Sequence, residues 1–357
     1  LLDYFRERFP KQLGDSDFVH RQALKAKALD AVRGALPAAA LSNVGIYASG
    51  QAYEALLLRM RAHPLPEARS YADLMLTELR KVIPSFLKRV DLTDRGVAAS
   101  TYLATTRTAM DEIAGRLFPD DDGDEGGGPS VELVEFDPDA EVRLVTAMLY
   151  AYTDRPAPEI ETRVRAMTVD ERMAVVRAYV GDRTNRRHRP GRAFERPTYR
   201  FDVLADYGAF RDLQRHRLLT VEWQPLSPRH GYTRPEAVDD AGCGGTFDET
   251  MARSTALHDA LAERFPAQAP YAVALAYRLR FVMQMNAREA MHLIELRSAP
   301  QGHPAYRVVA QQMHRLIADK AGHHAVAEAM RFADHSPEPQ LERLAGERRA
   351  EQRRLSR

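Results

Sequence analysis

One pattern of twelve residues occurs twice in this chain, at a constant offset of 236 residues. The first copy reads GQAYEALLLRMR over residues 50–61, and the second reads NAREAMHLIELR over residues 286–297. Apolar residues recur in both at helical spacing, and a second periodic helix follows each copy. Because each copy of a repeat folds as the same unit, this pattern constrains the architecture more than composition does. We therefore predict two tandem copies of one domain, with the first copy partial.

The region before the second copy indicates an α+β fold. Tyr199, Phe201 and Val203 alternate with polar residues, which predicts a strand. A helix is expected over residues 141–153. We predict helices packed around a small antiparallel sheet in each copy.

Further local signals predict helices elsewhere. Helices are expected over residues 1–36, where Pro37 ends the helix, over residues 50–61, over residues 67–90, and after a capping box of Thr168 and Glu171. A loop is expected over residues 233–250, which contain several glycines and acids.

Composition sets the domain boundaries. Residues 119–138 begin with PDDDGDEGGGP, a run that buries nothing, so they predict a flexible acidic linker without EF-hand spacing. Residues 1–118 are predicted to be the C-terminal half of a first, degenerate copy, residues 139–335 the second copy, and residues 336–357 a charged tail. Because the chain starts at Leu1 rather than Met, we expect that residues are missing upstream.

Charge and cysteine content are consistent with a cytoplasmic protein. The 51 basic and 50 acidic residues nearly cancel, so net charge indicates neither nucleic acid nor membrane binding. The single cysteine, Cys243, excludes an internal disulfide and fits a reducing compartment. It could act as a nucleophile, but no His and Asn arrangement is readable around it. No apolar run reaches the roughly 18 residues that span a bilayer.

A basic stretch after the predicted strand is the first candidate site. Arg215, His216 and Arg217 follow one another directly. Neighbours on a helix point about 100° apart, so the three cannot all face one acidic partner, but they could surround a diphosphate. Arginine binds phosphate oxygens with a planar fork. The alternative is a solvated basic helix end that favours the macrodipole.

The helix predicted over residues 286–297 carries a second set of polar side chains. Asn286 and Arg297 share one face, and Arg288 and His292 are adjacent on another. An amphipathic core helix with these residues in solvent is the alternative. We predict instead that this helix and the cations near residue 216 converge on one pocket.

Together these two stretches resemble the flavin-dependent thymidylate synthase family. The run RHR, followed by Ser227, Arg229 and Tyr232, is similar to the family pattern RHRxxSxNxxSxRY. Thr220 replaces the first Ser of that pattern, and the loop before Ser227 is two residues longer. Residues 286–297 are similar to the family helix N-A-R-x-x-M-(N/H)-F-L-x-L-R.

The resemblance implies methylation of the uracil base of dUMP, or of a related pyrimidine nucleotide. Methylenetetrahydrofolate would be the carbon donor, FAD the hydride carrier and NADPH the reductant, with no metal. It implies FAD contacts from Arg215, His216, Arg217, Asn286, Arg288 and His292. It implies nucleotide contacts from Ser227, Arg229, Arg297 and Glu195, with catalytic roles for Arg297, which would polarise the base, and for Ser227. Since the family forms tetramers, we expect a homodimer that rebuilds a pseudo-tetramer.

Departures from the family leave alternatives open. Asp212 stands where the family has a nucleotide-binding Gln, and residues 301–305 lack the family's HAQ-x-E run. The alternative function is therefore a catalytically diverged flavin- or nucleotide-binding homologue. Arg33 resembles a family arginine that touches the nucleotide, so the first copy either complements the second or is only structural. The seven arginines over residues 183–200 allow phosphate contact, a solvated face or, least favoured, nucleic-acid binding.

Overall fold

The computed structural model describes residues 1–13, 15–119 and 127–337, together with Leu344, Gly346 and Arg348. The chain divides into two compact units. The first unit consists of Leu1–Ala38, Glu125–Thr255 and Val273–Arg357, and the second of Ala39–Asp124 and Ala256–Ala272. Within the described ranges, every helix is too short or too polar to cross a bilayer.

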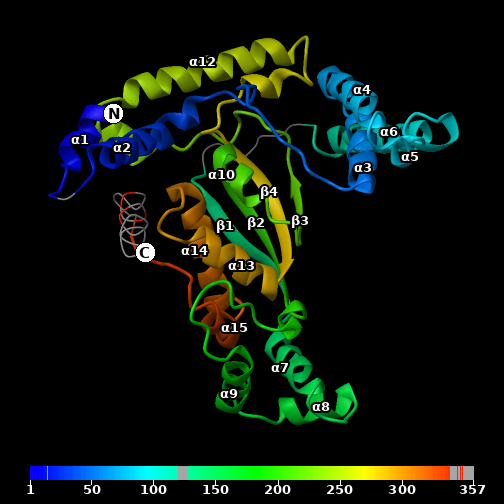
Figure 1. Cartoon of the computed structure of the whole chain (residues 1–357), viewed down its shortest axis with the longest axis vertical. Helices are drawn as coiled ribbons and strands as arrows, with labels where there is room; N and C mark the ends of the chain where they lie inside the picture. The colour runs from blue at the N-terminus through cyan, green and yellow to red at the C-terminus, as the bar shows by residue number, and fades with distance from the viewer. Residues whose placement is uncertain (14, 120–126, 338–343, 345, 347, 349–357) are drawn as a thin grey trace. The chain divides into compact units, whose positions relative to one another are not determined.

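A four-stranded antiparallel sheet forms the framework of the first unit (Figure 1). Its strands, in spatial order, are β1 (Ser130–Phe136), β2 (Thr198–Asp206), β4 (Arg278–Asn286) and β3 (Leu219–Trp223). The alternation that predicted β2 is confirmed, because Tyr199, Phe201 and Val203 are buried. The α+β class and the small antiparallel sheet are therefore confirmed for this unit.

The sheet unit also contains helices. They include α1 (Leu2–Arg8), α2 (Asp17–Val32), α7 (Ala140–Tyr150), α8 (Ala157–Arg165), α9 (Val169–Val180), α10 (Tyr207–Leu213), α11 (Glu236–Asp240), α13 (Ala287–Arg297), α14 (Pro304–Asp319) and α15 (His324–Ala329). Two 3-10 turns, Arg33–Ala35 and Arg192–Glu195, join them. Of the helices, α10, α13 and α14 contact the strands. The predicted capping box of Thr168 and Glu171 is present at the start of α9.

The main core lies between the sheet and helices α13 and α14, which pack against it (Figure 1). Phe201 and Phe281 from the strands meet Leu293 and Met313 from the helices, and all four side chains are buried. Burial of each such side chain contributes roughly 1.5–3 kcal/mol. This core fixes α13 on the sheet, and α13 carries half of the predicted site.

The second unit is helical in its described part. It contains α3 (Gly50–Arg61), α4 (Pro66–Arg80), α5 (Pro84–Leu87), a π-helical turn over Thr93–Val97, α6 (Ala98–Leu117) and a 3-10 turn over Ala269–Ala272. Its core is formed by Leu57, Ala72, Leu76, Leu87 and Val90. Helix α12 (Gly244–Ala262) begins in the first unit and ends in the second.

Several predicted boundaries are wrong. The helix expected over residues 1–36 is split into α1 and α2, and Pro10 lies in the break, where it lacks an N–H and restricts the residue before it. The helix expected over residues 67–90 ends at Arg80, because Pro84 starts a new short helix. The loop expected over residues 233–250 contains α11 and the start of α12.

The segment assigned to a linker also needs correction. Residues 130–136 form β1, whose Leu133 is buried in the main core, so the linker predicted over residues 119–138 is wrong for this part. Of the acidic run itself, residues 120–126 lie outside the described residues. The proposed tail over residues 336–357 also lies largely outside them.

A short backbone ladder joins the N-terminal segment to the sheet unit. The N–H groups of Leu275 and Ala276 donate to the carbonyls of Leu36 and Gly34, at 2.9 and 2.8 Å. A Cβ at Gly34 would lie only 3.0 Å from the Cβ of Ala276, so the approach favours glycine. The compact units thus divide the predicted 1–118 copy at Ala38. The tandem repeat itself stays a prediction.

Candidate functional site

A buried chain of three polar side chains links α13 to the turn after α10. Nδ1 of His216 lies 2.9 Å from Oε1 of Glu289, and Nε of Arg297 donates to Nε2 of His216 at 3.1 Å. The side chains of His216 and Glu289 are 3% and 5% exposed. His216 from the RHR run thus meets Glu289 and Arg297 from the helix over residues 286–297. The convergence of the two stretches on one pocket stays a prediction.

The sheet explains why these residues meet. Asp206 at the end of β2 caps α10 by accepting the N–H of Ala209 at 2.7 Å, and Asn286 at the end of β4 caps α13 by accepting the N–H of Glu289 at 2.9 Å. Because β2 and β4 are antiparallel, these two helices begin at opposite ends of the sheet. Helix α13 therefore runs back towards α10 and brings Arg297 to Asp212.

Three arginines from separate segments surround the Asp212 carboxylate, and we call them the arginine cluster. Terminal nitrogens of Arg33, Arg215 and Arg297 lie 3.4, 3.4 and 3.5 Å from its oxygens. Nη2 of Arg297 also donates to the Asp212 carbonyl at 2.5 Å, and its guanidinium lies 5.3 Å from the ring centre of Tyr306. Three positive charges against one negative charge leave an excess of two. The arginine cluster can therefore attract an anion.

The three side chains of the RHR run point in different directions. The side chain of Arg215 is 68% exposed, and Arg217 is also exposed, whereas His216 is buried. This divergence follows from the different directions of consecutive side chains. Ser227, half-buried, and Arg229, exposed, lie in the loop after β3 and are not part of the chain through His216.

Arg288 and Glu195 anchor to α13 the segment of residues 181–197 between α9 and β2, which we call the arginine-rich loop. Arg288 donates from Nε to the carbonyl of Pro190 and from Nη1 to Oε1 of Glu195, both at 3.1 Å. Glu195 also accepts hydrogen bonds from Arg192, and Arg192 first, then Arg288, holds the pKa of Glu195 below its ordinary value. Glu195 is therefore an ionised partner of arginines.

His292 on α13 lies beside the ring of His216, which contacts the same helix through Glu289. The two rings meet edge to face, with centres 5.3 Å apart. Burial is the main cause that lowers the pKa of His292, and the charges of Arg189 and Arg186 lower it further. The arginine-rich loop is thus electrostatically close to His292, which is held neutral near neutral pH.

His216, Glu289 and His292 also form a group that could be considered for a metal ion. Their potential ligand atoms all lie within 4.8 Å of one another. Binding an ion would compete with the bond from Arg297 to Nε2 of His216 or with the bond from Nδ1 to Glu289. Arg186 and Arg189 add repulsion of a cation. The donor set therefore fits a hydrogen-bond network better than a metal centre.

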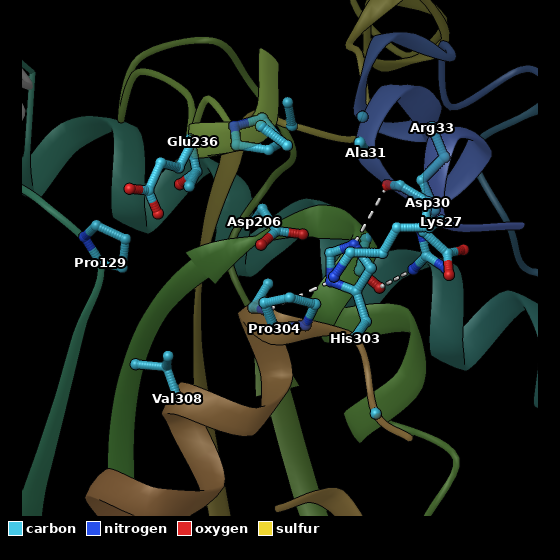
Figure 2. A pocket seen from close by; sticks show the side chains of 18 of the residues that line it. Lys27, Asp30, Ala31, Arg33, Pro129, Asp206, Glu236, His303, Pro304 and Val308 are labelled. Atoms are coloured by element: carbon cyan, nitrogen blue, oxygen red, sulfur yellow. Dashed lines mark hydrogen bonds between the residues drawn. The ribbon is translucent and has the colours of Figure 1, made fainter. Parts of the chain in front are cut away.

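A cavity of about 570 Å³ is lined in part by Arg33, one member of the arginine cluster (Figure 2). Arg33 lines one wall, Asp206 lies at the end of β2, and His303 lies at the start of α14 (Figure 2). His303 accepts the N–H of Ala305 at Nδ1 and contacts the carbonyl of Asp30 through Nε2, at 3.3 and 3.4 Å. Burial raises the pKa of Asp206 and lowers that of His303. The volume is in the range of small-molecule sites.

Sequence reasoning missed Glu289 and did not place Arg33 beside Asp212. Glu289 has a readable signal, because it lies four residues before the core residue Leu293 and therefore on the same face of the helix. Arg33 is predicted to lie in the first copy and, by resemblance, to touch the nucleotide. Its place beside Asp212, 179 residues away, has no local signal.

The sequence of the chain matches a known protein family. A model of the thymidylate synthase complementing protein family matches residues 132–322, more than half of the chain. The chain belongs to this family. It is the flavin-dependent thymidylate synthase family, so the resemblance seen in the RHR run and in residues 286–297 is confirmed. The match includes the RHR run and α13, whereas Arg33 lies outside it.

This chain is similar to three UPF0159 proteins. It is 35% identical to a UPF0159 protein of Chlamydia pneumoniae over 88% of its length, and 35% identical to one of Chlamydia muridarum over 97%. A UPF0159 protein of Thermoplasma acidophilum is 31% identical over 92%. The chain spans 59, 65 and 64% of the length of these three relatives, respectively.

A solved structure gives a partial match. The UMP/dUMP methylase PolB of Streptomyces cacaoi, solved with 5-Br dUMP, superposes with a TM-score of 0.46 at 19% identity. The match covers 58% of this chain and 99% of that one.

Proposed function

We propose that this family member methylates the base of a pyrimidine nucleotide, dUMP or a close relative, in an FAD-dependent reaction that uses methylenetetrahydrofolate and NADPH. The observation that carries the proposal is the arginine cluster: three guanidinium groups from three segments meet beside the buried His216–Glu289 pair. Membership of the family supports the same reaction.

The charge of the arginine cluster suits a nucleotide monophosphate. Its excess of two positive charges favours an anionic nucleotide, because a phosphate monoester carries about −1.5 to −2 at neutral pH. Ser227 and Arg229 are proposed to add contacts to the same phosphate, as the family pattern implies. The neighbouring cavity has room for a small ligand.

Arg297 is proposed to polarise the base. Its guanidinium keeps its charge at every physiological pH and carries five N–H donors. Nε and Nη2 each use one donor, on His216 and the Asp212 carbonyl, and Nη1 lies 3.5 Å from the Asp212 carboxylate. The remaining donors can stabilise negative charge that develops on a carbonyl oxygen of the uracil ring. No protein nucleophile is needed for this role.

The donor set on the other side of His216 fits a flavin cofactor. Arg186 and Arg189 of the arginine-rich loop lie near His292, and cations suit the diphosphate of FAD. Arg215, His216, Arg217, Asn286, Arg288 and His292 are proposed to hold it. When bound, reduced FAD would supply a hydride to the one-carbon unit. The chain itself would position the nucleotide, exclude water and stabilise the charge on the base as the C5 proton leaves.

Two measurements on the full-length protein test this proposal. The absorbance spectrum should show bound flavin and should change on addition of dUMP. Tritium should be released from dUMP labelled at C5 when methylenetetrahydrofolate and NADPH are present, because methylation replaces that hydrogen. R297M should lower the release at least 100-fold, about the loss of one strong electrostatic donor. R280M, a control on β4 whose arginine pairs with Asp202, should leave it nearly unchanged. A colourless protein that takes up no FAD would overturn the proposal.

A catalytically diverged binding protein is the second candidate. Asp212 favours it, because its carboxylate occupies the arginine cluster and would repel a phosphate. Saturable binding of flavin and nucleotide without any tritium release would support this candidate over the enzyme.

A further inference from the structure

We propose that Glu289 and His216 are positioning residues, which hold the guanidinium of Arg297 in place through a single tautomer of His216. The inference rests on the proposed function, in which Arg297 contacts the base. Neither Glu289 nor the tautomer of His216 follows from the motifs that identify the family.

The donors and acceptors in the chain allow one arrangement. Nε of Arg297 always carries a hydrogen, so the Nε2 atom that it contacts at 3.1 Å must offer a lone pair. In a neutral imidazole the hydrogen then resides on Nδ1, and Nδ1–H donates to Oε1 of Glu289 at 2.9 Å. Glu289 thus selects the tautomer of His216 that can accept from Arg297.

Burial makes this selection effective. With exposed fractions of 3% and 5%, His216 and Glu289 have little access to water that could replace a lost partner. A buried polar group without a partner costs about 1–3 kcal/mol, so the ring resists rotation away from this arrangement. Second partners of this kind also fix imidazole rings at metal sites, where they set the tautomer of the ligand.

Arg297 is held at four points. His216 takes Nε, the Asp212 carbonyl takes Nη2, the Asp212 carboxylate lies 3.5 Å from Nη1, and the Tyr306 ring supports the plane of the guanidinium. Without His216 the Nε edge of the guanidinium would lose its hydrogen bond, so the group could shift although Asp212 and Tyr306 still contact it. Because an error of about 1 Å in a catalytic group can cost on the order of 100-fold in rate, the contact with His216 matters to the proposed reaction.

Nuclear magnetic resonance on the full-length protein tests the tautomer without any ligand. Nitrogen-15 spectra should show Nε2 of His216 as the unprotonated nitrogen and a slowly exchanging Nε–H of Arg297. E289Q keeps an acceptor oxygen and should preserve both signals. E289M fills the space without an acceptor and should abolish the single tautomer and speed exchange at Arg297. The same signals in wild type and E289M, in a folded protein, would overturn the inference.

Zinc titration distinguishes the positioning role from a metal site formed by the same residues. If Zn²⁺ binds His216, Glu289 and His292, it should displace the Arg297 Nε–H signal and remove the Nδ1 proton. Tight, saturable zinc binding that E289Q abolishes would show a metal site and overturn the positioning role. Unchanged spectra on addition of zinc support it.

The turnover assay then links position to function. E289M should lower kcat for tritium release at least 10-fold with a smaller change in KM, and E289Q should restore it to within about 3-fold of wild type. Equal losses in E289M and E289Q would contradict the inference, because both variants lack the charge but only one lacks the acceptor. If wild type shows no turnover, the proposed function fails, while the spectra still decide the positioning role.

Discussion

Asp212 determines the net charge of the arginine cluster. Its carboxylate neutralises part of the arginine cluster, and its side chain is only 16% exposed. The resemblance implies Gln at this position, so this chain carries an internal anion where the proposed function places an external one. The cluster is therefore already partly satisfied before any nucleotide arrives.

Replacing Asp212 with Asn should expose the charge of the arginine cluster. D212N leaves three guanidinium groups facing one another, so the melting temperature in low salt should fall. Inorganic phosphate should then raise the melting temperature of D212N more than that of wild type, because the anion takes the place of the lost carboxylate. D202N is a matched control, since Asp202 pairs with a single arginine, Arg280, at 3.0 Å. Equal phosphate shifts in D212N, D202N and wild type would refute this expectation.

At the scale of single elements, the ends of the helices determine the geometry of the site. Asn286 is predicted to contact FAD, yet the structure shows its side chain capping α13. Asp206 does the same for α10. Both caps lie at strand ends, so each helix leaves the sheet at a defined residue, and His216 and Glu289 keep their separation.

Variants of Asn286 separate the cap from a cofactor contact. N286D keeps the oxygen that caps α13, and its stability should match wild type, whereas N286A should lose about 1 kcal/mol of unfolding free energy in urea. If Asn286 also contacts FAD, N286D should bind flavin more weakly despite its normal stability. T168A is the control, because it removes the cap of α9 and should cost a similar amount without changing flavin affinity. Loss of stability in N286D would show that the cap is not its main role.

At the scale of the whole sheet unit, one buried ion pair joins distant segments. Nη1 and Nη2 of Arg183 donate to the Glu295 carboxylate at 2.7 and 2.8 Å, and both side chains are almost fully buried. Arg183 also donates to the carbonyls of His188 and Ala329. The pair therefore ties the arginine-rich loop and the end of α15 to α13.

Loss of one partner of this ion pair should lower the unfolding free energy far more than replacement of both partners. E295A leaves the Arg183 charge buried without its main partner, so the unfolding free energy should fall by about 3–5 kcal/mol. The double variant R183M/E295M removes both charges and fills the space, and it should be more stable than E295A. Urea unfolding measures both. A double variant less stable than E295A would contradict the argument.

Buried histidines should give this unit a characteristic pH dependence. Burial is the first cause that lowers the pKa of His292, His303 and His323. These groups stay neutral in the folded chain but take up protons below about pH 6.5 when unfolded. Stability is therefore complete above about pH 6.5 and falls as the pH drops towards the lowered pKa values, by up to about 1.4 kcal/mol per pH unit for each group. Asp206, whose pKa is raised by burial, acts in the opposite direction above about pH 3.9.

Urea unfolding between about pH 5 and pH 7.5 measures this dependence. Three histidines lower the stability as the pH falls, and Asp206 acts in the opposite direction. The unfolding free energy should therefore decrease with acid across the window. H323F removes one titrating group next to the Tyr199 hydroxyl and should reduce the slope. A free energy that is constant or rises towards acid would contradict the assignment of neutral buried histidines.

Local patterns in the sequence determined much of what this protein is. The alternation of Tyr199, Phe201 and Val203 predicted β2, and helical periodicity predicted α13, because a strand or helix shows its period along a short stretch of chain. The RHR run and residues 286–297 were sufficient to identify the family. Proline breaks and the strand β1 were missed, since they depend on a few residues without a period.

Only the tertiary structure decided which side chains meet. The register of β2 and β4 sends α13 back towards α10, and this brings Glu289 to His216 and Arg297 to Asp212. The pairing of residues 33–38 with residues 273–276 brings Arg33 to the same carboxylate. The separation of residues far apart in sequence depends on strand order and packing, which no local spacing encodes.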